Sequence, residues 1–446
     1  MDSPTNRLRA VIQSIRRFLS QGAVGQAFRS KIVQNAVWMF WGQGLQLVGR
    51  LAYFVIIARV LGPTGYGTFI ACVALVATVS PFASCGTGNV MIKYAALNRE
   101  ALPAYFGNAL VSTIFSGTVL TFAVWILRPY VLPASATSAM LIAVAIADLF
   151  GTELIGICLY AFLSLEQGRR YSHMAALSTG IRLVAALGLL FSSHSALHWA
   201  YLYAASAILA AVTGVVGVSL LCARPRFDFG LFVPSMREGV HFATALASQS
   251  VYNDIDKTML SRYGMLAADG IYSMAYRVID VSCTPIRALH SAAFPRFCQM
   301  GRNGARGSIA FTAKLLSKTL PFGLLAAAVM FLTAPIIPHV VGPSFASSVS
   351  ALQWLCLLPV FRSLHLGAGD TLTGAGYQRY RTAAQLGAAG LNFGLNLWLI
   401  PAYSWHGAAW SSLVTDGGLA AGNWILLGLL LRRENHPCLE PQAATI

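Results

Sequence analysis

Residues 198–222 read HWAYLYAASAILAAVTGVVGVSLLC, an apolar run that contains no Asp, Glu, Lys or Arg. A helix of about 20 such residues crosses the hydrocarbon core of a bilayer. Similar runs recur along the chain, and short breaks that contain Arg, Lys, Pro or Asn separate them. The chain is 56% hydrophobic and 10% charged, whereas soluble domains carry about 25% charged residues. The sequence therefore predicts an all-α integral membrane protein with about twelve transmembrane helices, and it argues against a soluble fold.

We expect these helices to form two lobes of about six spans each around a central cavity. The expected spans are residues 36–58, 67–91, 104–127, 137–164, 172–192, 198–222, 239–261, 266–295, 312–334, 345–374, 380–400 and 406–431. The corresponding segments are a basic N-terminal segment (1–35), an N-lobe (36–222), an inter-lobe linker (223–238), a C-lobe (239–431) and a tail (432–446).

A short internal repeat supports the division into two lobes. Arg59 is followed after seven residues by Gly67, and Arg262 is followed after seven residues by Gly270. Both copies follow an odd-numbered span and open an even-numbered one. Many transporters are built from such internal repeats, so the pattern indicates two lobes of similar orientation.

The net charge of +16 is explained by the positions of the basic residues. If the N-terminus is cytoplasmic, nearly all Lys and Arg residues between spans lie on the cytoplasmic side, and only Arg59, Arg128 and Arg262 lie on the other. Cytoplasmic loops of membrane proteins carry this excess of basic residues. The sequence thus predicts two cytoplasmic termini and gives no reason to expect a nucleic-acid partner.

The N-terminal segment and the cysteines suggest no further chemistry. Apolar residues recur at helical spacing within residues 8–19 among arginines, which favours an amphipathic helix on the membrane surface, although a disordered tail is the alternative. The eight cysteines include no CxxC pair and are typical of core residues. We expect no catalytic residue, metal or cofactor.

Charged residues inside the spans are the most informative feature. They are Arg50, Asp148, Glu153, Arg182, Asp254, Asp256, Lys257, Arg277, Asp280, Arg287, Arg362 and Asp370. Each costs roughly 2.5–3.5 kcal/mol at the centre of a lipid-exposed helix, against a total stability of about 5–15 kcal/mol. These side chains must therefore face one another or water.

Helical spacing places the polar residues on three faces. The eighth span carries Ser273, Arg277, Asp280, Thr284, Arg287 and Ser291, with Pro285 available to bend it; the seventh carries Gln249, Asn253, Asp256 and Lys257; the first carries Gln43, Gln46 and Arg50. Three polar faces predict a hydrated cavity between the lobes.

Arginines in such a cavity could bind phosphate through a bidentate fork. The candidate substrate-binding residues are Arg277, Arg287, Arg50, Arg362 and Lys257. The alternative for any of them is a buried salt bridge that fixes helix packing, which we favour for Asp148 and Glu153 with Arg182. Intramembrane carboxylates could also carry H⁺ or Na⁺, and the candidates for ion coupling are Asp254, Asp256 and Asp370.

Several motifs resemble those of the Wzx-type polysaccharide flippases, whose superfamily also holds multidrug and toxic compound extrusion transporters and lipid II flippases. The motifs are IARVLGPTGYG at 57–67, DKTML at 256–260, GIYSMAYR at 270–277 and FPR at 294–296. The resemblance implies two lobes that open alternately, with lipid tails of the substrate left in the membrane beside a lateral gate. It also implies that Arg277 faces a cavity for the diphosphate and first sugars of an undecaprenyl-linked oligosaccharide.

The leading hypothesis is therefore translocation of an undecaprenyl-diphosphate-linked repeat unit across the bacterial inner membrane. It would serve exopolysaccharide or O-antigen biosynthesis, with membrane lipids, a polysaccharide polymerase and chain-length proteins as candidate partners. The alternative is a cation-coupled multidrug antiporter of the same fold. A membrane polysaccharide polymerase or ligase is disfavoured, because the sequence offers no sizeable outer loop for catalytic residues.

Overall fold

The computed structural model describes residues 31–192, 194–301 and 304–435. The amphipathic helix expected within residues 8–19 and most of the expected tail, residues 436–446, lie outside this described part. Within it, the regular elements are all helices. The all-α prediction is confirmed.

The first half of the chain forms the helices from α3 to α9. Their bounds are α3 (Lys31–Val79), η1 (Ser80–Phe82), α4 (Thr87–Leu97), η2 (Arg99–Ala101), α5 (Leu102–Val131), α6 (Ser138–Ala145), η3 (Ile146–Thr152), α7 (Glu153–Ser164), α8 (Gly168–Leu189) and α9 (Ala196–Leu221). The element η3 is a π-helix that joins α6 to α7 without a break.

The second half forms the helices from α10 to α18. Their bounds are α10 (Phe229–Arg262), α11 (Leu266–Ser282), α12 (Thr284–Met300), α13 (Ala305–Thr333), η5 (Ala334–Ile336), α14 (Ile337–Val341), η6 (Pro343–Phe345), α15 (Ser347–Leu355), α16 (Leu358–Gly374), α17 (Gln378–Tyr403) and α18 (Trp405–Asn435).

Eight helical segments of the described chain are long and apolar enough to cross a membrane. One of them, Gly44–Phe82, holds two expected spans, because Gly62 has a positive φ of 66° and Pro63 follows it, which kinks α3. The remaining expected spans correspond to α10, to α11 with α12, and to α17. Their polar residues lower the hydropathy of these helices, and those of α10, α11 and α12 contribute to the site described below.

The inter-lobe linker is shorter than the expected 223–238, because α10 begins at Phe229. The carboxylate of Asp228 caps this helix by accepting from the backbone N–H groups of Gly230 and Leu231. Pro234, within the range expected for the linker, lies inside the helix. The segment before the cap is held on α5, where Asn108 exchanges two hydrogen bonds with the backbone of Asp228.

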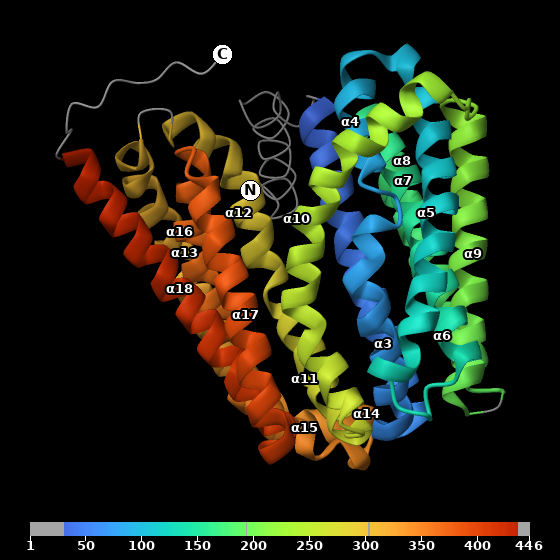
Figure 1. The fold of residues 1–446 in the computed structure, drawn as a ribbon, viewed down its shortest axis with the longest axis vertical. Coiled ribbons are helices and arrows are strands. Elements are labelled where there is room, and N and C mark those ends of the chain that lie inside the picture. The colour runs from blue at the N-terminus through green and yellow to red at the C-terminus, as the bar shows by residue number, and fades with distance from the viewer. Residues whose placement is uncertain (1–30, 193, 302–303, 436–446) are drawn as a thin grey trace, which may run out of the picture.

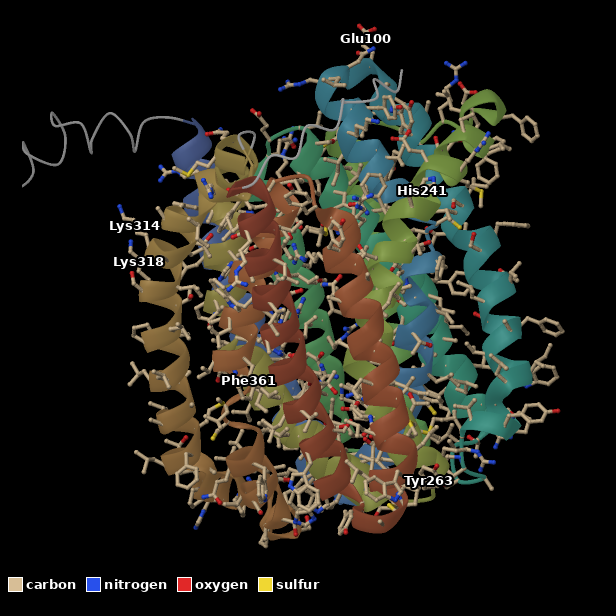
Figure 2. The ribbon with its side chains drawn as sticks, turned by 60° about the vertical axis from the view of Figure 1, so that its left-hand side comes forward. Glu100, His241, Tyr263, Lys314, Lys318 and Phe361 are labelled. Carbon is tan, nitrogen blue, oxygen red and sulfur yellow. The ribbon has the colours of Figure 1, made fainter. Side chains whose placement is uncertain are left out.

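The helices form two groups that diverge in Figure 1, with α10 and α11 between them. At one end α14 approaches α3, and the two groups meet. The groups separate toward the other end, where α3 begins and α18 ends, and which we call the termini end. Figure 2 shows Glu100 at the termini end and Tyr263 near the opposite end, with Lys314 and Lys318 on the half of α13 nearer the termini.

The two glycines of the internal repeat pack against each other across the halves of the molecule. A Cβ atom on Gly67 would lie 1.8 Å from the carbonyl oxygen of Leu266, and one on Gly270 would lie 2.1 Å from that of Pro63. Only glycine permits this approach of α3 and α11. The repeated positions therefore form one reciprocal contact between α3 and α11.

Helix α10 is in contact with both halves. Its first part packs on the N-terminal half, where Gly239 lies so close to the Cys85 carbonyl that a Cβ would be 2.2 Å away. Nearby, Lys93 and Glu238 form an ion pair of 2.7 Å. Its last part is hydrogen-bonded to α18, through Asp256 and Ser412.

Candidate functional site

The eighth expected span is broken in the middle, between α11 and α12. Pro285 lacks the backbone N–H that would continue the helical hydrogen bonding. The carbonyl of Val281, four residues earlier, therefore loses its helical partner. Beside it, the backbone carbonyl of Asp280 accepts from the Thr284 hydroxyl at 3.0 Å and from Arg287 Nη2 at 2.8 Å. The break expected at Pro285 is thus present, and an arginine side chain stabilises it.

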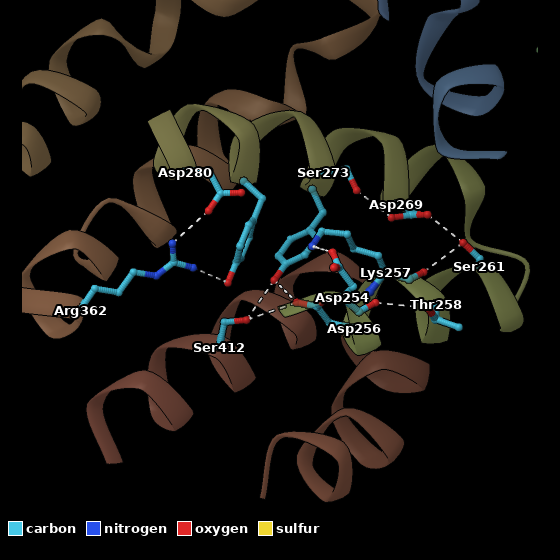
Figure 3. Close-up of polar contacts among 12 residues, drawn as sticks. Asp254, Asp256, Lys257, Thr258, Ser261, Asp269, Ser273, Asp280, Arg362 and Ser412 are labelled. Atoms are coloured by element: carbon cyan, nitrogen blue, oxygen red, sulfur yellow. Dashed lines mark hydrogen bonds and ion pairs between the residues drawn. The ribbon is translucent and has the colours of Figure 1, made fainter. Parts of the chain in front are cut away.

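Three arginines surround Asp280 at this break; we call Arg277, Asp280, Arg287 and Arg362 the arginine cluster. The Asp280 carboxylate lies 3.0 Å from Arg362 Nη1 and 3.7 Å from Arg287 Nη1. Arg362 is 7% exposed, whereas the side chain of Arg287 is 46% exposed. Figure 3 shows Arg362 reaching from α16 to Asp280 and to the hydroxyl of a tyrosine of α11. Arg362 therefore holds the cluster together, and Arg287 presents its charge at the surface.

Tyr276 links the arginine cluster to Lys257. Its hydroxyl accepts from Arg362 Nη2 at 3.0 Å, and its ring lies 4.5 Å from Lys257 Nζ and 5.4 Å from the Arg362 guanidinium carbon. Lys257 also forms an ion pair of 2.7 Å with Asp254. A tyrosine ring stabilises adjacent cations through its negative face, so Tyr276 holds two positive charges near each other.

Arg277 has a different environment from Arg362. Its guanidinium carbon lies 4.4 Å above the centre of the Phe54 ring of α3, and its charge interacts with Tyr66, Asp280 and Tyr53. Among the residues that the structure describes, no carboxylate lies within 4.0 Å of it. The ring contact takes up no N–H donor, and a guanidinium carries five of them, so Arg277 can interact with Tyr66 and still donate to a ligand.

The arginine cluster holds three arginines and one aspartate, a formal charge of +2, but the charges are not equally accessible. Asp256 and Asp416 lie buried beneath Lys257 and Arg362. Arg287 is exposed and Arg277 is half-buried. The side chain of Asp280 is 36% exposed as well, so the accessible part of the cluster holds two arginines and one aspartate. Its net positive charge suits an anionic ligand.

The structure does not bring Arg50 into this cluster. Arg50 is exposed on α3, donates to Gln46 Oε1 of its own helix at 3.4 Å, and has Tyr171 of α8 as a neighbour. Helical spacing alone predicted that Arg50 faces the cavity. The rotation of α3 about its own axis instead turns this side chain toward Tyr171 of α8. The side chains of Gln43, Gln249 and Asn253, expected on the same polar faces, lie outside the described part.

The three carboxylates considered for ion coupling have separate partners. Asp254 pairs with Lys257, as above. Asp256 accepts from the hydroxyls of Tyr272 and Ser412. Asp370 lies in another cluster, where it contacts His290 Nδ1 at 2.8 Å and Arg381 Nη1 at 3.1 Å.

The expected salt bridges of Arg182 with Asp148 and Glu153 are absent from the described residues. Arg182 donates to the Thr152 hydroxyl at 3.4 Å, and that hydroxyl donates to Asp148 at 3.3 Å. Arg182 also lies 4.5 Å above the Tyr203 ring. The Thr152 hydroxyl thus bridges Arg182 of α8 and Asp148 of η3.

Sequence reasoning missed several members of these networks. Tyr276 precedes Arg277 in a quoted motif, and its position four residues before Asp280 could have indicated a shared face. Asp269 stands near the start of its helix and suggests an interfacial residue, yet it is fully buried and accepts from Ser261 and Ser273 (Figure 3). Nothing in the sequence indicated that His290 contacts Asp370, because the two residues lie 80 positions apart.

The family model described as "polysaccharide biosynthesis protein" matches residues 32–301, more than half of the chain. The comparison with curated proteins gave no match.

Solved structures of transporters share the fold. An inward-facing multidrug resistance MATE family transporter of the MOP superfamily has a TM-score of 0.70 at 12% identity, over 88% of this chain and 96% of its own. An outward-facing structure of such a transporter has a TM-score of 0.57 at 15% identity, over 91% and 98%. A MOP superfamily transporter from Pyrococcus furiosus, reported with a binding pocket of reversed polarity, has a TM-score of 0.60 at 13% identity, over 90% and 96%. These similarities establish a multi-pass, all-α transporter fold.

Proposed function

The chain belongs to the polysaccharide biosynthesis protein family, and from that premise we propose that it moves an undecaprenyl-diphosphate-linked oligosaccharide across the bacterial inner membrane. The repeat unit would enter exopolysaccharide or O-antigen synthesis. The transporter fold supports movement of a substrate rather than covalent chemistry on it. The family match agrees with the motifs that indicated a Wzx-type flippase.

The arginine cluster is the observation that carries this proposal. A lipid-linked oligosaccharide presents a diphosphate between its polyprenyl chain and its first sugar, and this anion is the part most costly to move through a bilayer. Arg277 and Arg287 supply accessible guanidinium groups beside a helix break. Guanidinium forks match phosphate oxygens in geometry and charge, so the cluster would replace the water that the diphosphate loses.

The arrangement of the two helix groups supports alternating access. The groups meet through Gly67 and Gly270 and diverge toward the termini end (Figure 1). In the proposed cycle the diphosphate enters from the termini end, which we place in the cytoplasm, and binds the arginine cluster. The groups then close at that end and open at the other. No bond is made or broken.

The proposal is tested by Arg277→Ala in cells that depend on this protein for a surface polysaccharide. We expect the variant to insert normally, to make no polymer and to accumulate lipid-linked repeat units on the cytoplasmic leaflet. Arg99→Ala, which removes an exposed arginine at the termini end far along the chain from the cluster, is the matched control and should make normal polymer. Normal polymer from Arg277→Ala would overturn the proposal.

A multidrug antiporter of the same fold is the second candidate, because several of the similar structures are multidrug transporters. At 12–15% identity this likeness shows the fold alone. Cationic drugs are bound by acidic and aromatic sites, and the accessible guanidinium groups would repel them. A rise in drug resistance on expression, with no effect on polymer, would favour this candidate.

A further inference from the structure

The N-terminal half contains a second group of polar side chains inside the bundle, which the arginine cluster does not use. We call Asp148, Thr152, Glu153, Arg182 and Tyr203 the N-lobe polar cluster. Tyr203 donates to Asp148 Oδ1 at 2.7 Å, and Thr152 joins Asp148 to Arg182. The cluster draws on η3, α7, α8 and α9, four consecutive elements of the N-terminal half.

A π-helix holds two of these side chains, Asp148 and Thr152. Residues Ile146–Thr152 form η3 within an otherwise α-helical span, and the Thr152 hydroxyl donates to Asp148, four residues earlier, at 3.3 Å. Gly151 packs on α9, where a Cβ would lie 2.6 Å from the Cβ of Ala207. Short π-helices cost stability and occur frequently at functional sites.

The charges of the cluster are incompletely neutralised. Glu153 accepts from the Ser80 hydroxyl at 3.3 Å, and throughout the described ranges no Lys or Arg lies within 4.0 Å of it. Arg182 meets a hydroxyl and a ring instead of a carboxylate. Thr152 is exposed, so a ligand can reach it. Ionisable residues of a membrane span that lack a charged partner indicate a binding site.

The chemistry of the cluster suits a sugar. A sugar hydroxyl both donates and accepts hydrogen bonds, and it carries no charge. Asp148 and Glu153 accept, Arg182 donates, and the Thr152 hydroxyl does both. A site that combines donors and acceptors in this way discriminates between sugars, because a mismatched hydroxyl would leave a buried polar group unpaired.

The two clusters are neighbours. Arg277 lies above the Phe54 ring, and its charge interacts with Asp148. Tyr53 packs beside Phe54 with ring centroids 4.5 Å apart, and it also lies next to Arg182. The Tyr53 and Phe54 rings therefore separate the arginine cluster from the N-lobe polar cluster.

We propose that the N-lobe polar cluster binds the first sugar of the lipid-linked oligosaccharide while the arginine cluster binds its diphosphate. The first sugar is bonded directly to the diphosphate. When the diphosphate binds the arginine cluster, this sugar would therefore lie next to it, at the N-lobe polar cluster. This inference rests on the proposed function and assigns sugar selection to the N-terminal half.

The test compares binding of two kinds of lipid to the purified full chain. The probes are bare undecaprenyl diphosphate and undecaprenyl diphosphate bearing one glucose, galactose or N-acetylglucosamine. We expect the wild type to bind at least one glycosylated lipid more tightly than the bare lipid. Thr152→Val and Glu153→Gln should each weaken that binding about 10-fold and leave bare-lipid binding unchanged. Thr118→Val, which removes an exposed hydroxyl bonded only to its own helix, is the matched control.

Three other outcomes would overturn the inference, and they differ from failure of the proposed function. Equal binding of bare and glycosylated lipids by the wild type would overturn it, as would equal loss of both lipids in Thr152→Val and Glu153→Gln. A changed pH dependence of transport with unchanged sugar preference would assign the cluster to proton binding instead. If the wild type binds no undecaprenyl diphosphate at all, the proposed function itself is refuted, and the inference that rests on it is refuted with it. Arg277→Ala should lose both lipids.

Discussion

Removal of Arg362 should destabilise the protein more than removal of any other arginine of the cluster. Arg362→Ala deletes two hydrogen bonds of 3.0 Å, to Asp280 and to the Tyr276 hydroxyl, from a site that is 7% exposed. Loss of one partner of a buried ion pair costs about 3–5 kcal/mol, largely because the other charge stays buried. Asp280 is 36% exposed and keeps Arg287 at 3.7 Å, so we expect about 2–3 kcal/mol.

The assay is unfolding of the purified protein in mixed micelles, measured for Arg362→Ala, Asp280→Asn and the double variant. Because Asp280→Asn removes the carboxylate that Arg362→Ala leaves without its partner, the double variant should be less destabilised than the sum of the singles by about 1 kcal/mol or more. If the losses of unfolding free energy in the two single variants add up to the loss in the double variant, the conclusion that this pair is structural is refuted. A loss below about 1 kcal/mol for Arg362→Ala would refute it too.

Three further perturbations test other parts of the structure. Arg287→Ala should change unfolding free energy by only about 0–1 kcal/mol because the side chain is exposed, yet weaken undecaprenyl diphosphate binding measured on the same preparation; a large stability loss would contradict this. Gly270→Ala should cost about 1–3 kcal/mol, because its Cβ would meet the Pro63 carbonyl, and a wild-type unfolding curve would contradict the close contact. The hydrogen bond from Lys93 lowers the pKa of Glu238, and the same bond raises the pKa of Lys93. The α4–α10 contact should hold above the ordinary pKa of glutamate, loosen as pH falls through the lowered pKa, and loosen again as pH rises through the raised pKa of Lys93. Distances between spin labels on α4 and α10 would show this, and no change at either extreme would contradict it.

The spans could be predicted from sequence because the bilayer imposes one requirement on all of them. A membrane helix must be long and apolar, and its backbone hydrogen bonds must be internal. That requirement gave approximate bounds even for the polar α10 and α17. It could not show that α10 begins at Phe229, outside the expected apolar span, because the cap that Asp228 provides depends on local backbone geometry and not on hydropathy.

The pairing of charged side chains could be predicted only in part. Spacing along one helix correctly grouped Arg277, Asp280 and Arg287 on the eighth span. The rotation of each helix about its axis is set by packing, which a single sequence does not reveal. Arg50 therefore lies outside the cluster, and Asp370 pairs with His290 of a distant helix.

Helix α10 sets a mechanical condition on any exchange between open states. Its first turns are fastened to α4 by the Lys93 and Glu238 pair and by the close approach of Gly239, while its last turns are bonded through Asp256 to Ser412 of α18. The Asp256–Ser412 contact lies toward the end where the two helix groups meet (Figure 1), and the Lys93–Glu238 contact lies toward the termini end. Opening of the groups at the end where they now meet would therefore bend α10 or break the bond between Asp256 and Ser412, and a cross-link that prevents both should stop the proposed cycle with substrate still bound.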